Sequence, residues 1–389
     1  MRRTLLRPLA IISAVAGFAL VATSPVETAR RPRYGGTLRV EIGASVATPD
    51  PATAASTAEE SAAKEQIDGL ICAGRNPDGT FAGAPGDGAF RVAAWEPGKH
   101  ARLVANDDCR TGRPFVDSIE IQMGRSARDL LLDLELNKTD FAEISPEQAR
   151  VAAQRGVRVS RSRPDELLAL VFPGAAGDRK NDLRAREAIA GAVDRAAIVN
   201  FILQKEGQPA GGLLPQWSSG TAFLFSTASD PHGAKELWSQ IAPSPRWVLG
   251  YDSADPLEKL IAERVVVNAR ESGISLQLKA IAGGAPDGNV NIRLIRLRMA
   301  SPEPRAALAK SLEALAPMAG LDAEPLPAPA SPQDIYDRER AALDGFRIVP
   351  LVWLPQVYGL SARVRDWTAP AAGETWPLAD LWLEEEAAQ

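Results

Sequence analysis

Histidine and cysteine are scarce in this chain of 389 residues. The two histidines, His100 and His232, leave little material for histidine-based metal binding or acid–base catalysis. The two cysteines cannot build a disulfide-dense scaffold or a four-cysteine zinc site. Basic residues are not in excess either, because 44 lysines and arginines face 49 aspartates and glutamates. The composition therefore argues against a nucleic-acid-binding protein.

Catalytic motifs are also missing. The sequence has no Gly-x-Ser-x-Gly elbow and no Walker phosphate loop, and no spaced pair of carboxylates stands out from ordinary helix faces. We therefore expect no enzyme activity, no cofactor and no bound metal. An exported hydrolase is the catalytic alternative, and the shortage of histidines argues against it.

Only the start of the chain has a long apolar run. A basic stretch, an apolar stretch and small residues follow one another there: Arg2, Arg3 and Arg7, then 9–21, then Ala22, Thr23 and Ser24. This order is typical of a secretory signal peptide, so we predict cleavage of residues 1–24, with Pro25 leaving the exact position open. An uncleaved amino-terminal anchor is the alternative. No cysteine lies nearby to carry a lipid, and no later run approaches ~20 apolar residues. We expect a soluble chain that is periplasmic or otherwise exported.

Helix signals and strand signals alternate along the rest of the chain. Capping residues mark five helix starts, at Ser126, Ser145, Asp182, Asp255 and Ser331. Alternating or continuous apolar runs mark strands, among them 38–42, 90–95, 101–105, 119–123, 167–172, 274–278 and 346–353. An alanine-rich stretch at 52–64 is predicted as a helix or a loose connection. The pattern indicates an α/β fold of two lobes.

Cys72 and Cys109 lie in turn-like surroundings on either side of a segment rich in glycine and proline. In an oxidising compartment a disulfide between them would stabilise the fold by ~3 kcal/mol. Two separate, reduced cysteines are the equal alternative, because the sequence does not test the distance that a disulfide requires.

Aromatic residues in a loop are the most suggestive feature for binding. Trp217 and Phe223 belong to a glycine-rich stretch, 211–225, where aromatic side chains have less reason to be core. Loop aromatics often line ligand clefts. Packing of one lobe against the other is the competing explanation. Trp353, within an apolar run, is predicted to lie in the core.

Several segments resemble one family when taken in order. Residues 34–40, Tyr-Gly-Gly-Thr-Leu-Arg-Val, and Thr-Pro-Asp-Pro at 48–51 resemble the mature start of bacterial extracellular solute-binding proteins of family 5. These are the dipeptide-, oligopeptide- and nickel-binding components of ABC importers. Further similar segments follow in the family's order at 88–92, 95–98, 103–107, 112–119, 182–200, 349–351 and 357–360.

The resemblance implies a two-lobed periplasmic binding-protein fold, type II and cluster C-like, whose small additional domain is largely missing. It implies a first lobe of 34–182 plus 345–389, with 69–88 in place of the extra domain, and a second lobe of 183–344. A small solute, peptide-like or other, would be held between the lobes and delivered to the membrane subunits of an ABC permease. The resemblance suggests a monomer that binds no nucleic acid.

Besides the missing domain, the sequence differs from the family at the residues that bind the ligand. Peptide binders of the family hold the ligand's amino group with an aspartate in a Trp-x-x-Asp-Tyr-x-x-Pro-like stretch, and here Leu297 and Ala300 fall where tryptophan and aspartate would stand. A buried ammonium group would then lack its carboxylate, which argues against a peptide amino terminus as ligand. Arg293, Arg296 and Arg298 nearby would suit an anionic ligand. They would equally suit the outward face of a strand.

We therefore expect a ligand-binding cleft walled by Trp217 and Phe223, with Arg163, just before the apolar run 167–172, as a polar contact. The alternative is a degenerate, non-transporting relative that acts as a sensor or a protein-binding accessory subunit. Loss of the domain beside the cleft favours that alternative, because the exposed side would become a protein interface.

Overall fold

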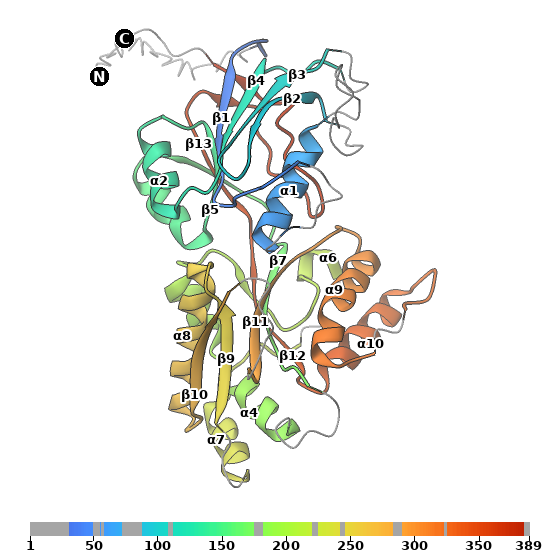
Figure 1. The fold of residues 1–389 in the computed structure, drawn as a ribbon. Coiled ribbons are helices and arrows are strands. Elements are labelled where there is room, and N and C mark those ends of the chain that lie inside the picture. The colour runs from blue at the N-terminus through green and yellow to red at the C-terminus, as the bar shows by residue number, and fades with distance from the viewer. Residues whose placement is uncertain are drawn as a thin grey trace, which may run out of the picture. The chain divides into compact units, whose positions relative to one another are not determined.

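The computed structural model describes residues 31–49, 55, 58–71, 88–107, 112–174, 182–219, 225–241, 246–282, 290–322 and 325–384 (Figure 1). The predicted signal peptide at 1–24 lies outside these residues, as do Cys72, Cys109 and Phe223. Most of the segment 69–88 lies outside them as well. In the part of the chain that is described, no helix combines the length and the apolar content needed to cross a membrane.

Seven of the described strands form the first sheet. In spatial order they are β2 (Phe90–Glu96), β3 (His100–Ala105), β4 (Ser118–Gln122), β1 (Thr37–Glu41), β5 (Phe141–Ile144), β13 (Val357–Leu360) and β6 (Arg158–Arg161). The sheet is mixed: β1 runs parallel to β4 and β5, whereas β13 is antiparallel to β5 and β6. A short pair, β14 (Val364–Arg365) and β15 (Trp382–Leu383), lies after β13 in the chain.

Two apolar cores cover the faces of this sheet. Neighbouring residues of β5 point into different cores, because side chains alternate along a strand. Phe141 packs with Tyr358 and with Ile67 of helix α1 (Ala58–Leu70), whereas Ala142 packs with residues of α2 (Ala127–Glu135) and α3 (Ala149–Gln154). We call the first sheet with these helices the first lobe.

The helix starts in the first lobe confirm two predicted positions, although the Ser145 side chain makes no capping hydrogen bond. The Ser126 side chain accepts a hydrogen bond from the Asp129 amide and caps α2. Pro146 opens a 3-10 turn, η1 (Pro146–Gln148), that leads into α3. Helix α1 differs from the expected 52–64, because it continues to Leu70, and its last apolar residues fill the core under the sheet.

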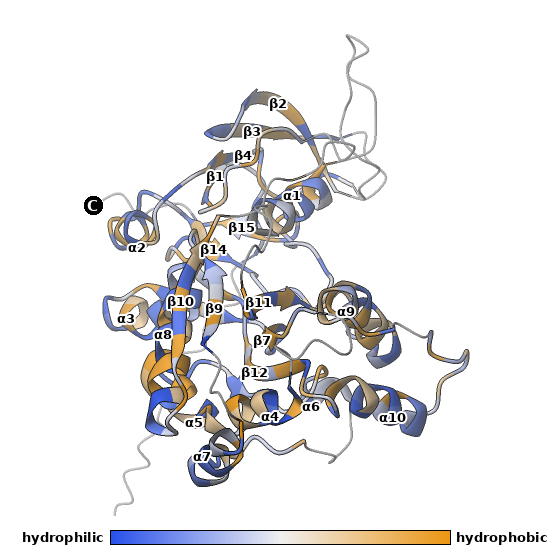
Figure 2. Ribbon diagram, turned by 60° about the horizontal axis from the view of Figure 1, so that its bottom comes forward, coloured by the Kyte–Doolittle hydropathy of each residue, from blue (hydrophilic) through white to orange (hydrophobic). Residues whose placement is uncertain are grey.

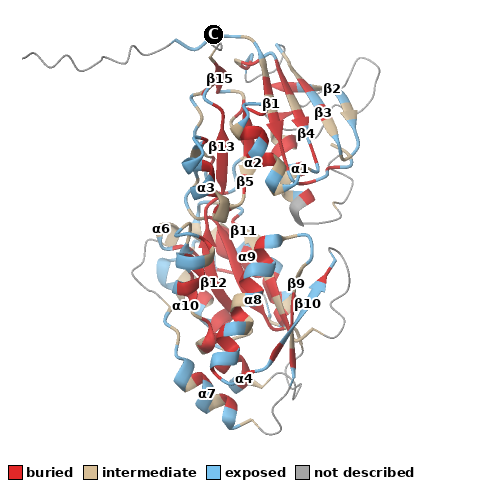
Figure 3. Ribbon diagram, turned by 90° about the vertical axis from the view of Figure 1, so that its left-hand side faces the viewer, coloured by how far each residue is buried: buried red, intermediate tan, exposed pale blue. Residues whose placement is uncertain are grey.

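The second sheet has six strands within the described ranges. In spatial order they are β10 (Leu276–Ile281), β9 (Trp247–Asp252), β11 (Ile292–Arg298), β7 (Glu166–Val171), β12 (Ile348–Leu354) and β8 (Gln208–Pro209). Strands β7 and β12 are buried along their whole length, and Figure 3 shows β12 in the buried colour. In Figure 2 the same strand is largely hydrophobic. A continuous apolar run is the expected signature of a strand covered on both faces.

Helices cover both faces of the second sheet. They are α4 (Leu183–Ala192), α5 (Arg195–Ala197), a π-helical turn η3 (Ile198–Ile202), α6 (Gln216–Ser219), α7 (Pro231–Ser239), α8 (Pro256–Glu271), α9 (Pro304–Ala319) and α10 (Pro332–Leu343). Leu168 and Leu170 of β7 face a core that contains α4 and α8, whereas Leu167 and Ala169 face a core that contains α9 and α10. Trp353 is 3% exposed, as its apolar surroundings predict. We call this sheet with its helices the second lobe.

The sheets refine the division of the chain that the sequence suggests. That division assigns 34–182 and 345–389 to the first lobe. Strands β7 and β12 fall within those ranges, yet both hydrogen-bond to strands of the second sheet. The chain therefore crosses between the sheets just before β7 and just after β12, and these crossings position the site described below.

Helix α10 begins with a capping box, as predicted at Ser331. The Ser331 hydroxyl accepts from the Asp334 amide, and the Asp334 carboxylate accepts from the Ser331 amide. We expect Ser331→Ala to lower the free energy of unfolding by about 1 kcal/mol, because it leaves a helix-terminal amide unbonded. Urea denaturation measures the change. Ser219→Ala, whose hydroxyl bonds only within its own short helix α6, is the control and should change stability by less.

Candidate functional site

Two short segments connect the sheets and lie side by side. One, 162–165, runs from β6 to β7, and the other, 355–356, runs from β12 to β13. The Ser162 amide donates to the Gln356 carbonyl at 3.0 Å, and the Asp165 amide donates to the Leu354 carbonyl at 3.0 Å. The Gln356 amide in turn donates to the Ser162 hydroxyl at 2.9 Å. We call these two paired segments the hinge.

A buried carboxyl group lies in the middle of the hinge. Asp165 is 1% exposed, and its carboxyl oxygens accept from the Gln356 amide nitrogen at 2.7 Å and the Ser162 hydroxyl at 3.3 Å. The Tyr358 hydroxyl donates to the other end of the Gln356 side chain at 2.5 Å. Burial, with a smaller contribution from the neighbouring Glu166 charge, raises the pKa of Asp165 to about 7. Near neutral pH the hinge therefore holds a proton that an exposed aspartate would have lost.

Two arginines of β11 point toward the hinge region and are engaged by carboxylates of the protein. Arg296 binds Glu166 at 2.7 Å and Asp255, the N-cap of α8, at 2.9 Å. Arg298 binds Glu143 of β5 at 2.9 Å. Burial alone would raise the pKa of Glu166, but the two guanidinium groups outweigh it and hold that pKa below its ordinary value.

These ion pairs answer the question that the arginine-rich strand poses in the sequence. The Arg296 and Arg298 side chains do not form a free outward face, and an anionic ligand would have to displace carboxylates that already bind them. The Arg298 pair also joins the two lobes, since Glu143 belongs to the first sheet and β11 to the second. A second pair does the same: Arg161 of β6 binds the Glu206 carboxylate through two hydrogen bonds, of 2.7 and 2.6 Å.

Two of the sequence-predicted site residues meet beside the hinge. Trp217 lies on the short helix α6, and its indole N–H donates to the Pro164 carbonyl at 2.7 Å. The Arg163 guanidinium carbon lies 5.5 Å from the centre of the Trp217 ring, in cation–π range. Arg163 is exposed and Trp217 is half-buried. The structure thus brings together the Trp217 ring and the Arg163 cation, which lie 54 positions apart in the sequence.

The buried hinge carboxyls are residues that the sequence reasoning missed. Asp165 and Glu166 stand directly before the apolar run of β7. Two acidic residues at the start of a buried strand were the sequence signal that could have indicated buried carboxyl groups. Their partners Gln356 and Arg296 lie far along the chain, so no local pattern connects them.

Neither of two cavities in the described part of the molecule is lined by residues of both sheets. One, of about 310 Å³, lies at the β6 edge of the first sheet. The other, of about 70 Å³, lies in the second lobe and is lined by residues that include Tyr336 and Glu339. Burial raises the pKa of Glu339 to about 7, although its carboxylate accepts from two backbone amides. Among the described residues no group of three or more His, Cys, Asp or Glu side chains has the arrangement of a metal site.

The family follows from comparison with known proteins. The model of bacterial extracellular solute-binding proteins, family 5, middle region, matches residues 40–312, which include strands of both sheets and the first hinge segment. The chain belongs to this family. The family resemblance read from the ordered segments of the sequence is thereby confirmed.

Solved structures of family-5 type proteins share the fold. NikA from Brucella suis, solved with Fe(III)-EDTA, superposes with a TM-score of 0.66 at 20% identity, over 80% of this chain and 71% of that one. A dipeptide-binding protein from Pseudoalteromonas sp. SM9913, solved with Met-Leu, gives a TM-score of 0.66 at 16% identity, over 78% and 66% of the two chains. These likenesses confirm the two-lobed α/β fold of a family-5 solute-binding protein.

A curated relative covers less of the chain. The oligopeptide-binding protein AppA of Bacillus subtilis is 26% identical over 129 residues, which are 32% of this chain and 23% of that protein. The match therefore spans about a quarter of the relative's own length, and what that protein binds is evidence only for a proposal.

Proposed function

We propose that this protein is the exported solute-binding component of an ABC importer. It captures a small solute, peptide-like or other, between its two lobes and delivers it to the membrane subunits of the permease. It catalyses no reaction and works as a monomer. The observation that carries the proposal is the hinge: two adjacent strand connections join two independently packed lobes in a chain of the solute-binding family.

The contacts across the hinge suggest how the lobes would respond to a ligand. Opening would separate Arg298 from Glu143 and Arg161 from Glu206, while the paired backbone of the hinge would remain. The side chains of these pairs are partly exposed, so each contributes ~1 kcal/mol or less. A ligand shifts the equilibrium between open and closed forms only by the difference between its affinities for the two forms. Because these ion pairs are weak, a modest difference in affinity is enough to decide which form is populated.

The ligand contacts of this proposal are Trp217 and Phe223 as aromatic walls and Arg163 as a polar contact. The support for Trp217 and Arg163 is their meeting beside the hinge, where a ligand held between lobes would touch them. Arg163 has its charge exposed, whereas Arg296 and Arg298 of β11 are engaged in ion pairs, so Arg163 is better placed than they are to receive an anionic group.

A thermal-shift screen of the purified chain tests the proposal, with short peptides, oligosaccharides, nickel chelates and anionic metabolites as the panel. A ligand at ~100 times its dissociation constant adds ~2.7 kcal/mol to the free energy of unfolding, a clear rise in melting temperature. We expect one ligand class to give this rise and Trp217→Ala to abolish it.

Trp95→Ala is the matched control for that substitution. Trp95 is also half-buried and also donates its indole N–H to a backbone carbonyl, that of Ala47, but it lies on β2 in the first sheet. It should leave the ligand-induced shift intact. Equal loss in both variants would show that the shift reports general stability and not a cleft at Trp217.

A non-transporting relative is the second candidate. The observation that favours it is the engagement of Arg296 and Arg298 by carboxylates of the protein itself, together with two cavities that both lie away from the hinge. No shift with any panel member, and an unchanged radius of gyration in small-angle scattering with and without the panel, would favour a sensor or protein-binding role.

A further inference from the structure

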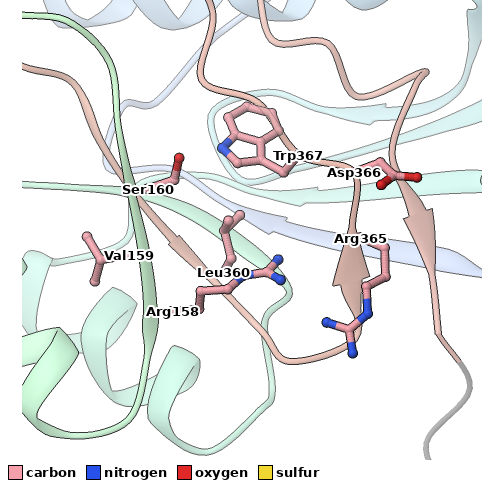
Figure 4. A pocket seen from close by; sticks show the side chains of 7 residues that line it. All are labelled: Arg158, Val159, Ser160, Leu360, Arg365, Asp366 and Trp367. Carbon is pink, nitrogen blue, oxygen red and sulfur yellow. The ribbon is translucent and has the colours of Figure 1, made fainter. Parts of the chain in front are cut away.

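The larger cavity lies wholly within the first lobe, at the open edge of its sheet (Figure 4). Its residues come from β6, from the end of β13, and from β14 with the segment after it. The hollow has a volume of about 310 Å³, which is the lower end of the range for small-molecule sites. We call it the edge pocket. No residue of the second sheet lines it, so it is separate from the cleft of the proposed function.

Two arginines in the edge pocket repel each other. Arg158 begins β6, and Arg365 lies on β14. The pKa of Arg158 lies below its ordinary value because burial removes water from the guanidinium group and because the Arg365 charge opposes it. Two like charges held close together are stabilised by an anion between them.

The two arginines differ in how they are already bonded. Arg365 has a carboxylate partner, Glu384, which accepts from its Nε at 3.0 Å and from its Nη2. Arg158 donates to the Val364 carbonyl at 2.6 Å, and within the described ranges no carboxylate pairs with it. A guanidinium group carries five N–H donors, so Arg158 has donors to spare for a ligand. Asp366, the acidic residue of the lining, binds the Trp382 indole N–H at 2.5 Å.

The backbone of β6 adds a donor at the same place. Strand β6 ends the first sheet, and the Ser162 amide that follows it points to β13. Because backbone groups alternate along a strand, the Val159 amide points the other way, toward the open edge. The edge pocket therefore offers cationic and neutral donors along one side.

The remaining lining includes Ser160, the Val159 backbone and two apolar side chains, Leu360 and Trp367. Trp367 is held in place by edge-on contacts with Phe141 and Tyr358 at ring-centre distances of 4.8 and 5.1 Å. A bare inorganic anion would leave this surface uncovered. An anion attached to an apolar body would contact both the arginines and the apolar residues of the edge pocket.

We propose that the edge pocket binds a small organic carboxylate whose aromatic or short aliphatic body packs on Trp367 and Leu360. The carboxylate lies between Arg158 and Arg365 and takes the free donors of Arg158, since a guanidinium group matches a carboxylate through two parallel hydrogen bonds. This gives the first lobe a ligand site of its own, which does not depend on the two lobes closing.

Isothermal titration of the full chain with benzoate and hexanoate tests the proposal, with inorganic phosphate as the probe without an apolar body. We expect both carboxylates to bind at millimolar concentration or below, and phosphate to bind more weakly. Arg158→Gln should weaken benzoate at least ~10-fold, the effect of losing one hydrogen bond to a charged group. Arg155→Gln, a nearby arginine that pairs with Glu135 outside the pocket, should leave the affinity unchanged.

Three results would overturn the proposal: no heat from any carboxylate, phosphate binding as tightly as benzoate, or equal benzoate affinity in Arg158→Gln and the unaltered chain. A second measurement needs no variant. Intermolecular NMR contacts from benzoate ring protons should reach Trp367 and the Leu360 methyl groups, and contacts only with other residues would place the ligand elsewhere. The melting temperature of ligand-free Arg158→Gln should stay near that of the unaltered chain, because a lost hydrogen bond is offset by relief of repulsion from Arg365.

Discussion

Asp165→Asn is expected to raise the free energy of unfolding by up to roughly 4 kcal/mol at pH 8 and by less than half of that at pH 5. The reason is the position of the Asp165 carboxyl in the hinge, where burial raises its pKa from the ordinary 3.8 to about 7. Between these two values the folded chain keeps a proton that the unfolded chain releases. The free energy of unfolding therefore falls as pH rises through that window. The Asn side chain does not ionise, so it does not cause this loss.

Urea denaturation of both proteins at several pH values from 5 to 8 measures this effect. The unaltered chain should lose stability toward pH 8 more steeply than Asp165→Asn. Part of the slope will remain in the variant, because burial also raises the pKa of Glu258 and Glu339 to about 7. Asp337→Asn, at an exposed position on α10, is the surface control. Parallel pH profiles for Asp165→Asn and the unaltered chain would contradict the prediction.

Arg296→Met is expected to lower the free energy of unfolding by about 3 kcal/mol at pH 7, because it leaves the buried Glu166 carboxylate without the guanidinium group that binds it. The Met side chain keeps most of the volume and removes the charge. Glu166, which is 7% exposed, and Asp255 would then keep their negative charges without the guanidinium group that both bind. Loss of packing alone would cost much less, since the swap is close to volume-conserving.

A double variant separates charge from packing. Glu166→Gln with Arg296→Met removes both partners of the buried pair, so it should recover a large part of the loss seen in Arg296→Met. Guanidinium salts screen ion pairs, and urea is therefore the denaturant of choice. A loss below about 1 kcal/mol in the single variant, which is the value of an exposed pair, would contradict the prediction.

The sequence best predicted the features that depend on contacts between residues close together in the chain. Helices α2, α8 and α10 begin where Ser126, Asp255 and Ser331 indicated, because a cap is a contact over two or three positions. The buried strand β7 was visible as an apolar run for a similar reason. The family was recognisable from ordered short segments, and the family model confirms it.

What the sequence left open depends on long-range contacts. The alternation that predicts a strand is the same whichever sheet the strand joins, so the membership of β7 and β12 in the second sheet had no local signal. The Arg298–Glu143 pair joins residues 155 positions apart, and the arginines of β11 therefore fitted a ligand site and an outward face equally well. The ligand contacts Trp217, Phe223 and Arg163 stay predictions.

The second hinge segment has a consequence for how the chain is made. Strand β12 lies between β7 and β8 in one sheet, and β13 lies between β5 and β6 in the other, so both sheets are completed by the stretch 348–360. A nascent chain that has not yet reached this stretch lacks an interior strand in each lobe and exposes two apolar surfaces. Neither lobe can finish folding before this stretch has been made, since each lacks an interior strand until then. The completion of both lobes thus depends on one short stretch of the chain.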